Sequence, residues 1–394
     1  MSLFFLGWVF MYANRTVLSP LLEPLGTLWS LNETQLGLIT SAFFLTYTLL
    51  QVPFGWLAEK VGLKKQLVPG YLLHGIGAAA SGLAPGPGAF LAFRVFTGAT
   101  QASYFSPQYA LASRSIPVPR RGFGMAIINS GMAFGMSLGL IMSGTLVYSL
   151  GLSWRAPFVA LGALTLIVGA LFGLVIREGK AAAVADGAPS PAPTAPPASP
   201  YYRRNLLAAS GAAFFTMYSF YVILTWLPYY LQTVRGYSGS LAGNISTLMA
   251  FTSVPGGLFY GRLSDRLGLR KPIAMILIPI SAVALAAIVA PLSPALLAAV
   301  LIIYGLTGKL VIDPLYMAII ADVTPPERYA SAFGALNFAA TASMVLAPAI
   351  TGFIAHQTGS FVVAFYVAAA TSVLGAITLS FAREKRTAAT VPRA

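Results

Sequence analysis

Long apolar runs recur from one end of the chain to the other, and they limit the possible folds more than any other feature. Each run is about 19–30 residues long, enough for a helix to cross a hydrocarbon core of roughly 30 Å. The twelve runs cover residues 2–28, 34–58, 66–84, 88–113, 121–148, 154–176, 204–233, 240–263, 271–291, 294–320, 328–354 and 360–382. A β-barrel would show short segments of alternating hydrophobicity instead. We therefore predict an all-α membrane protein with twelve transmembrane helices.

The composition excludes several other classes of protein. Hydrophobic residues make up 57% of the chain and charged residues 9%, too few charges to cover a soluble domain. The chain has no cysteine, so disulfides and thiolate chemistry are not available. His74 and His356 are isolated in the sequence, which argues against a metal site. No phosphate-binding loop or nucleophile–base arrangement is present, so we expect neither an enzyme nor a bound cofactor.

One segment differs in composition and divides the chain. Residues 181–200 are rich in alanine and proline and cannot form a packed core, so they read as a flexible or polyproline-like linker. We predict a six-helix bundle at residues 1–180, a linker at 181–202 and a second six-helix bundle at 203–394. A monomer is expected.

The basic residues alternate between the two ends of the predicted helices. One side carries Lys60, Lys64, Lys65, Arg114, Arg120, Arg121, Arg177, Lys180, Arg203, Arg204, Arg262, Arg266, Arg270, Lys271, Arg328, Arg383, Lys385 and Arg386. The opposite loops carry Arg155 and Arg235 as exceptions. By the positive-inside rule the linker and both termini are cytoplasmic, in a multi-pass protein of the cytoplasmic membrane. This distribution accounts for the net charge of +14 without nucleic-acid binding.

The two halves repeat each other. The sequence GWLAEKVGLKK at residues 55–65 closes the second run, and GRLSDRLGLRK at residues 261–271 closes the eighth. A shorter echo relates Pro107 and Tyr109 in the fourth run to Pro314 and Tyr316 in the tenth. Parallel six-helix repeats place a substrate site near the membrane midplane between the halves.

The repeated loop resembles the signature loop of the major facilitator superfamily, and the resemblance extends over the whole chain. It implies that the loops form a conformational gate that stabilises the outward-facing state. The gate residues would be Gly55, Glu59, Lys60, Gly261, Asp265 and Arg266. Glycines at 55 and 261 would permit close helix approach, and Gly62 and Gly268 would permit tight turns. The alternative is that these charges only orient the helices.

Four further segments are similar to the anion:cation symporter group of that superfamily. They are YANRTVLS at residues 12–19, RVFTGATQ at 94–101, NSGMAFG at 129–135 and TWLPYYL at 225–231. Members of this group carry proton-binding carboxylates where this chain has Asn14 and Gln101, which cannot titrate. Asp313 remains as the candidate proton carrier. If Asp313 does not carry a proton, the protein would be an anion uniporter or exchanger.

We single out four charged residues inside the predicted spans: Arg15, Arg94, Lys309 and Asp313. An ionised side chain at the centre of a membrane helix costs about 2.5–3.5 kcal/mol, so such residues usually face a partner or a cavity. The guanidinium of Arg15 suits a carboxylate or phosphate. Arg94 either reaches the cavity or binds backbone carbonyls between spans one and four. Lys309 and Asp313 form an i,i+4 pair. The pair either has a purely structural role, or it opens when a substrate anion competes with Asp313 for the lysine.

Polar residues at helical spacing complete the predicted cavity, although each could instead bond between helices. The candidates for substrate binding besides Arg15, Lys309 and Arg94 are Tyr12, Gln51, Tyr104, Gln108, Tyr229 and Asn337. Further candidates for lining the cavity are Tyr47, Asn129, Tyr221 and Tyr304. Gly131, Gly135 and Gly139 form a flat face on span five, which we expect to pack against a helix of the other half.

These observations predict a secondary transporter that works by alternating access. The four buried charges sum to two positive charges, which favours a small organic anion such as a carboxylate, sugar acid or organophosphate. We expect proton-coupled import. The alternatives are export of a larger amphiphile such as a siderophore, drug or lipid, a non-transporting receptor, or a membrane enzyme.

Overall fold

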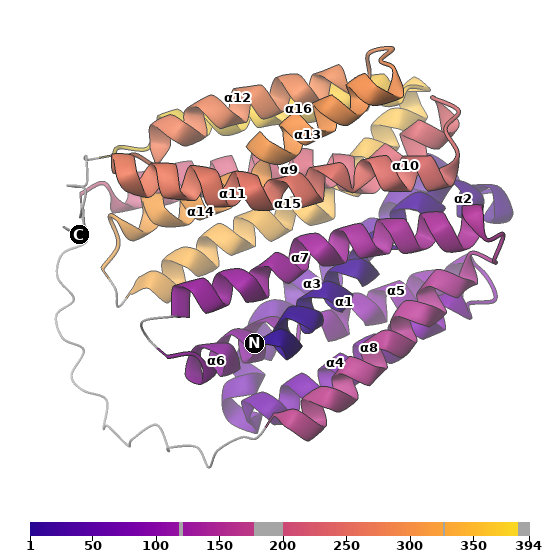
Figure 1. Cartoon of the computed structure of the whole chain (residues 1–394), viewed down its shortest axis with the longest axis horizontal. Helices are drawn as coiled ribbons and strands as arrows, with labels where there is room; N and C mark the ends of the chain where they lie inside the picture. The colour runs from indigo at the N-terminus through magenta and orange to yellow at the C-terminus, as the bar shows by residue number, and fades with distance from the viewer. Residues whose placement is uncertain (118–120, 177–199, 326–327, 385–394) are drawn as a thin grey trace. The chain divides into compact units, whose positions relative to one another are not determined.

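The computed structural model describes residues 1–117, 121–176, 200–325 and 328–384. Within these ranges it contains helices and no strand, so the all-α prediction is confirmed. Each of the twelve predicted runs corresponds to one helix or to two or three consecutive helical segments (Figure 1). Most of the predicted linker, residues 181–199, lies outside the described residues.

The first six runs form the following elements. They are α1 (Ser2–Thr16), η1 (Ser19–Leu21), α2 (Leu22–Trp29), α3 (Glu33–Val61), α4 (Leu63–Gly82), α5 (Pro87–Gln101), α6 (Phe105–Ser115), α7 (Arg121–Ser143), η3 (Gly144–Ser149) and α8 (Arg155–Val175).

The last six runs form a corresponding series. They are α9 (Tyr202–Thr233), α10 (Gly239–Ser246), α11 (Leu248–Leu267), α12 (Lys271–Ala287), α13 (Pro294–Thr307), α14 (Lys309–Ala321), α15 (Tyr329–Thr358) and α16 (Phe361–Ser380). Among the described residues, seven helical stretches are long and apolar enough to cross a membrane by length and composition alone.

Spans four and ten are each interrupted within their length. Span four breaks between α5 and α6, where Pro107 cannot donate the backbone hydrogen bond that a continuous helix would require. Span ten breaks at Gly308, whose extended backbone separates α13 from α14. When the two halves are aligned so that Pro107 corresponds to Pro314, the two breaks fall at nearly equivalent positions of the repeat. Interrupted membrane helices expose backbone groups where a polar cavity can use them.

Backbone contacts divide the chain into two compact units. Unit 1 comprises Met1–Ala182, Leu224–Thr247 and Pro348–Gly359, and unit 2 comprises Ala183–Ile223, Leu248–Ala347 and Ser360–Ala394. Unit 1 therefore includes the C-terminal part of α9, all of α10 and the C-terminal end of α15. Each unit is described by itself below.

In unit 1, α4 packs along α8 and α1 packs along α7 (Figure 1). The α1–α7 contact corrects the expectation that the glycines of span five face the other half. Gly131, Gly135 and Gly139 instead lie against the backbone carbonyls of Phe5, Val9 and Ala13 in α1. The four-residue spacing matches on both helices, so the small residues let the two backbones approach closely.

Unit 1 also joins the start of α3 to the end of α15. The backbone N–H of Ala349 donates to Ser41 Oγ at 3.1 Å, and Trp226 Nε1 donates to the Pro348 carbonyl at 3.2 Å. A Cβ on Gly37 would clash with that same carbonyl. These contacts lie at the ends of the helices opposite the basic loops.

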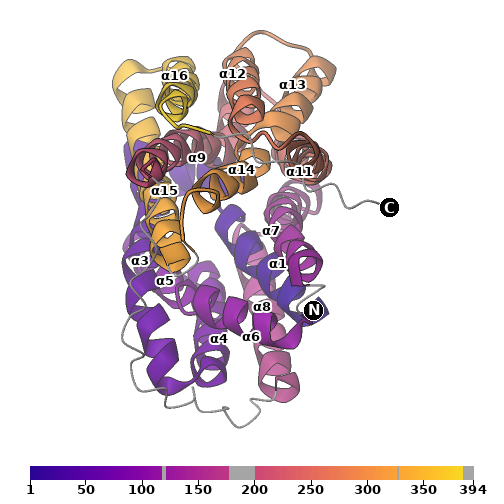
Figure 2. The same ribbon diagram turned by 90° about the vertical axis from the view of Figure 1, so that its left-hand side faces the viewer.

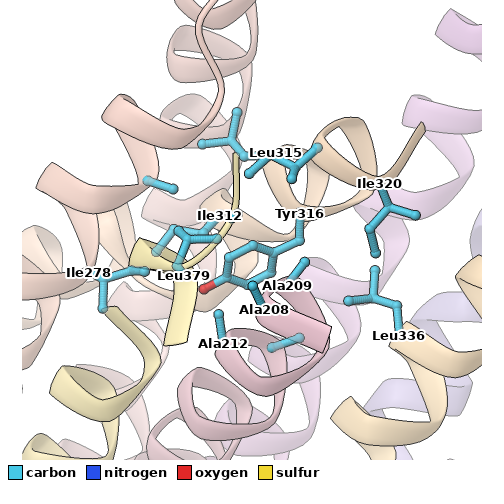
Figure 3. Packing of buried hydrophobic residues seen from close by; sticks show 14 of the residues in the cluster. Ala208, Ala209, Ala212, Ile278, Ile312, Leu315, Tyr316, Ile320, Leu336 and Leu379 are labelled. Atoms are coloured by element: carbon cyan, nitrogen blue, oxygen red, sulfur yellow. The ribbon is translucent and has the colours of Figure 1, made fainter. Parts of the chain in front are cut away.

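In unit 2, α12 packs against α16 (Figure 2). Its core gathers alanines of α9 around isoleucines, leucines and a tyrosine of α12, α14 and α15. Tyr316 lies in the centre of this cluster, beside Ala208, Ala212 and Leu379 (Figure 3). Its hydroxyl is 3.3 Å from Thr216 Oγ1, which satisfies the polar group inside an apolar core.

Candidate functional site

Arg15 lies in the last turn of α1, where the negative end of the helix dipole favours a cation. The residue is 4% exposed. Its Nε donates to Gln101 Oε1 at 2.9 Å. The guanidinium carbon lies 4.3 Å from the ring centre of Tyr12 and 4.5 Å from that of Tyr47. Two aromatic faces and one amide oxygen thus hold the guanidinium in place.

The two amides that depart from the symporter pattern are both part of the packed interior. Gln101 accepts from Arg15 and donates through Nε2 to the Met11 carbonyl at 3.0 Å. Asn14 donates through Nδ2 to Thr165 Oγ1 at 3.0 Å and to the Phe10 carbonyl at 2.9 Å. Both side chains form these hydrogen bonds as neutral amides. The hydrogen-bond network that they make therefore does not titrate.

Arg94 is 1% exposed and belongs to α5. Its Nη1 donates to the Asn14 carbonyl at 3.1 Å, and its guanidinium carbon lies 4.4 Å from the ring centre of Phe43. Nε and Nη2 have no hydrogen-bond partner among the described residues. Of the two roles predicted for Arg94, the structure shows the backbone contact between spans one and four.

Lys309 is the first residue of α14, directly after the break at Gly308. Its side chain is 1% exposed and pairs with Asp313, whose side chain is 33% exposed. The positive end of a helix dipole disfavours a lysine at this place, so Asp313 offsets both the dipole and the burial. The predicted i,i+4 pair is therefore present, and its carboxylate is the more accessible partner.

The remaining predicted cavity residues fall into different environments. In unit 1, Tyr104 is buried and donates to the Phe4 carbonyl at 3.2 Å, while Gln108 accepts from Trp8 Nε1 at 3.1 Å. Both belong to the packed interior around α1. Tyr12 contacts Arg15. Gln51 and Tyr229 are half-buried in unit 1, and Asn337 is half-buried in unit 2.

The additional polar residues and histidines also have identifiable surroundings. Tyr109 donates to Asn129 Oδ1 at 2.8 Å in unit 1, and Tyr304 is buried in unit 2. His74 Nδ1 lies 3.1 Å from the Thr97 carbonyl, and His356 Nδ1 lies 3.2 Å from Glu33 Oε2. In the described part of the chain, no group of three His, Cys, Asp or Glu side chains could hold a metal ion.

The first repeated loop has a tight turn and an exposed cation. Gly62 takes a φ of +105°, as expected for a glycine that ends α3. Lys60 Nζ lies 3.4 Å from the ring centre of Trp56. A Cβ on Gly55 would lie 3.3 Å from Ser106 Oγ, a close approach to α6. The side chain of Glu59 lies outside the described residues.

The second repeated loop contains an ion-pair cluster. Gly268 takes a φ of +63°, so the turn predicted here is confirmed. Arg270 Nη1 lies 3.0 Å from Asp265 Oδ1, and Arg270 Nε lies 3.9 Å from Asp322 Oδ2. The close approach expected at Gly261 is not seen, since no described atom lies within 4 Å of a Cβ built there. Arg266 lies in the last turn of α11.

Sequence reasoning missed two contributors to these sites. Gly308 sets the break that places Lys309 at a helix start, and a glycine directly before this lysine was the available signal. Asp322 joins the second loop cluster from the end of α14. Its signal was an acidic residue on the side where basic residues gather.

Comparisons with known proteins agree with this architecture. The sequence profile of the Major Facilitator Superfamily matches residues 4–243 and 210–394. The hexuronate transporter of Bacillus subtilis is 27% identical, over 95% of this chain and 91% of that protein. The voltage-gated purine nucleotide uniporter SLC17A9 of Mus musculus is 24% identical, over 94% of this chain and 86% of that protein.

A solved structure shows the same fold. It is an inward-facing and occupied bacterial homologue of the human lysosomal transporter Spinster, with a TM-score of 0.73 and 19% identity. The match covers 96% of this chain and 94% of that chain. The expected likeness to organic-anion transporters and the twelve-helix fold are both confirmed by these comparisons.

Proposed function

The chain belongs to the major facilitator superfamily of membrane transporters, and we propose that it carries a small organic anion by alternating access. One observation supports the charge of the cargo. Among the described residues, every charged side chain that is fully buried is a cation: Arg15, Arg94 and Lys309. Buried cations are costly without an anion nearby, and Asp313 supplies only one negative charge.

Arg15 is the proposed primary contact for the anion. Its guanidinium presents a planar fork that binds a carboxylate or a phosphate through two parallel hydrogen bonds. Its partner Gln101 is neutral, so an arriving anion does not displace a competing charge in unit 1. Tyr12 orients the guanidinium from its ring face.

Lys309 is the proposed second contact. Asp313 pairs with it, and a substrate anion would replace that carboxylate at the ammonium group. Asp313 is one-third exposed, so it can release the lysine toward water at modest cost. The other proposed binding residues are Arg94, Gln51, Tyr104, Gln108, Tyr229 and Asn337, of which Tyr104 and Gln108 would act by holding α1.

Two modes of coupling are consistent with this site. Asp313 could take up a proton when it leaves Lys309, which would couple anion import to protons. Asn14 and Gln101 favour the second mode, uniport or exchange without a proton, because their amides stay neutral at any physiological pH. The likeness to a nucleotide uniporter also supports that mode.

The remaining proposals concern the setting of the transporter. We propose that the protein lies in the cytoplasmic membrane with both termini inside, following the positive-inside rule. We also propose that it is a monomer. The two six-helix bundles, residues 1–180 and 203–394, would move against each other. The gate would be formed by the repeated loops at residues 55–65 and 261–271.

Uptake of labelled anions into proteoliposomes tests the proposed function. Glucuronate, galactarate, a nucleotide and the neutral sugar glucose are compared, with and without an inward proton gradient. Arg15→Gln and Lys309→Gln should each lower anion uptake at least about a hundredfold, the loss expected when one charged contact worth about 3 kcal/mol is removed. Arg203→Gln, an exposed arginine at the start of α9, is the matched control. Normal uptake by both variants would refute the proposed site.

The same assay separates the two modes of coupling. If Asp313 carries the proton, the gradient should stimulate wild-type uptake, and Asp313→Asn should abolish that stimulation. A gradient without effect on the wild-type protein would establish the uncoupled mode.

A further inference from the structure

A cavity of about 680 Å³ opens in unit 2, at the basic ends of α9, α12 and α16. Its polar lining consists of Tyr201, Lys271, Arg383 and Glu384. Its apolar lining includes Leu269, Pro272 and Met275. None of these residues belongs to the proposed transport site.

The segment that follows α16 builds one wall of this cavity. Asn205 and Arg383 exchange two hydrogen bonds of 2.8 Å, between the Asn205 side chain and the Arg383 backbone. Lys271 Nζ donates to the Ala382 carbonyl at 2.7 Å. The wall is therefore fixed to the first residues of both α9 and α12, and the cavity is a built feature of unit 2.

The one carboxylate in the lining is already engaged. Glu384 accepts the backbone N–H of Arg270 through Oε1 and that of Lys271 through Oε2, the latter at 3.0 Å. These donors are the free N–H groups at the start of α12, where the helix dipole favours an anion. The charge of Glu384 thus serves the helix end.

The guanidinium of Arg383 remains available to a ligand. Its carbon lies 5.6 Å from the ring centre of Tyr201, and the residue is exposed. Within the described ranges, the guanidinium of Arg383 forms no ion pair with a carboxylate. Together with the ammonium of Lys271, it makes the cavity attractive to an anion.

The apolar part of the lining restricts the kind of anion. Leu269, Pro272 and Met275 line the same cavity as the basic groups. Phe381 and Leu267, close in sequence to lining residues, are exposed. A free ion would gain nothing from these side chains. A phosphate that carries acyl chains would use both the basic and the apolar parts.

We propose that this cavity binds the phosphate group of an anionic phospholipid. Arg383 would hold the phosphate through its planar fork, and the glycerol and upper acyl chain would lie along the apolar wall. Basic pockets between membrane helices at the cytoplasmic surface are suited to such headgroups, and anionic lipids gather in that leaflet. The bound lipid would tie the ends of α9, α12 and α16 together.

Native mass spectrometry of the full chain in detergent tests this inference. The probes are phosphatidylglycerol, phosphatidylcholine and inorganic phosphate, added separately to delipidated protein. Arg383→Gln should weaken phosphatidylglycerol binding about fivefold, the effect of one basic residue near an anionic lipid. Arg328→Gln, an exposed arginine of unit 2 outside the cavity, is the matched control and should bind like the wild type.

Each outcome decides the proposal. Preference for phosphatidylglycerol over phosphatidylcholine that depends on Arg383 would support it. Equal binding of the two lipids, or equal loss in Arg383→Gln and Arg328→Gln, would overturn it. Binding of inorganic phosphate that depends on Arg383 and displaces the lipid would assign the site to free phosphate instead. Thermal unfolding of each variant without lipid checks that the cavity is still folded.

Discussion

The two units hold their buried cations by different means. In unit 1, the named partners of Arg15 and Arg94 are an amide oxygen and a backbone carbonyl, and neither carries a charge. In unit 2, Lys309 has a carboxylate partner, Asp313, one turn further along the same helix. A neutral partner cannot respond to pH, whereas a carboxylate can release its cation on protonation. Of the three buried cations described, Lys309 in unit 2 is therefore the one whose named partner can switch.

Asp313→Asn should give the largest effect on stability. It leaves the buried ammonium of Lys309 at the positive end of α14 without a counter-charge, so we expect a loss of about 3 kcal/mol. The thermal-unfolding midpoint in detergent measures it. The double variant Lys309→Met/Asp313→Asn removes both charges and should recover most of the loss. A double variant as unstable as Asp313→Asn alone would show that the pair does not balance charge.

Gln101→Glu would give the buried cation Arg15 in unit 1 a carboxylate partner, as Lys309 has in unit 2. The new carboxylate would lie where Gln101 Oε1 now accepts from Arg15, and it would compete with the substrate anion for the guanidinium. We expect anion affinity to fall about tenfold, equivalent to about 1.4 kcal/mol, and to recover when acid protonates the glutamate. Uptake measured against substrate concentration at two pH values tests this.

A matched substitution controls for the added charge. Gln66→Glu places a carboxylate at another buried glutamine of unit 1, one that donates to the Phe54 carbonyl. Its effect on anion affinity should not follow the pH dependence of Gln101→Glu. Identical pH profiles would remove the specific role of the Arg15–Gln101 contact.

The smallest expected effect on stability concerns Asp322, which lies outside the membrane-spanning helices of unit 2. Partial burial raises the pKa of Asp322, Arg270 opposes that rise, and Asp265 adds to it. Between the ordinary aspartate pKa and the raised one, the folded protein keeps a proton that the unfolded chain has lost. Stability from this group is therefore present at low pH and falls as pH rises through that window.

Asp322→Asn should remove this dependence, which is below about 1 kcal/mol because the carboxylate is partly exposed. The thermal-unfolding midpoint is followed as the pH rises from about 4 to about 6, above the ordinary aspartate pKa of about 3.9. A variant whose midpoint still falls with pH like that of the wild type would assign the effect to another group.

Sequence alone predicted the helices well because the apolar runs are long and the two loops repeat. The turns at Gly62 and Gly268 followed from their place after charged helix ends, and the Lys309–Asp313 pair followed from helical spacing. The partner of the span-five glycines did not follow, because spacing defines a flat face and not what lies against it. The interior roles of Tyr104 and Gln108 were also hidden, since a polar residue that bonds between helices has the same pattern as one that lines a cavity.

The breaks in spans four and ten show a further limit. A proline such as Pro107 tells that a helix is weakened, but which peptide unit gives way depends on tertiary contacts. The equivalence of the break at Ala102–Tyr104 with that at Gly308 became visible only once both helices were observed. The break at Gly308 is what places Lys309 at a helix start.

Equilibrium binding of glucuronate and of glucose to the purified protein tests most directly whether buried cations select an anion. The two sugars differ at one carbon, a carboxylate in glucuronate and an alcohol in glucose. The account predicts heat of binding for glucuronate alone, and its loss in both Arg15→Gln and Lys309→Gln. Glucose binding as tightly as glucuronate, or glucuronate binding unchanged in both variants, would contradict it.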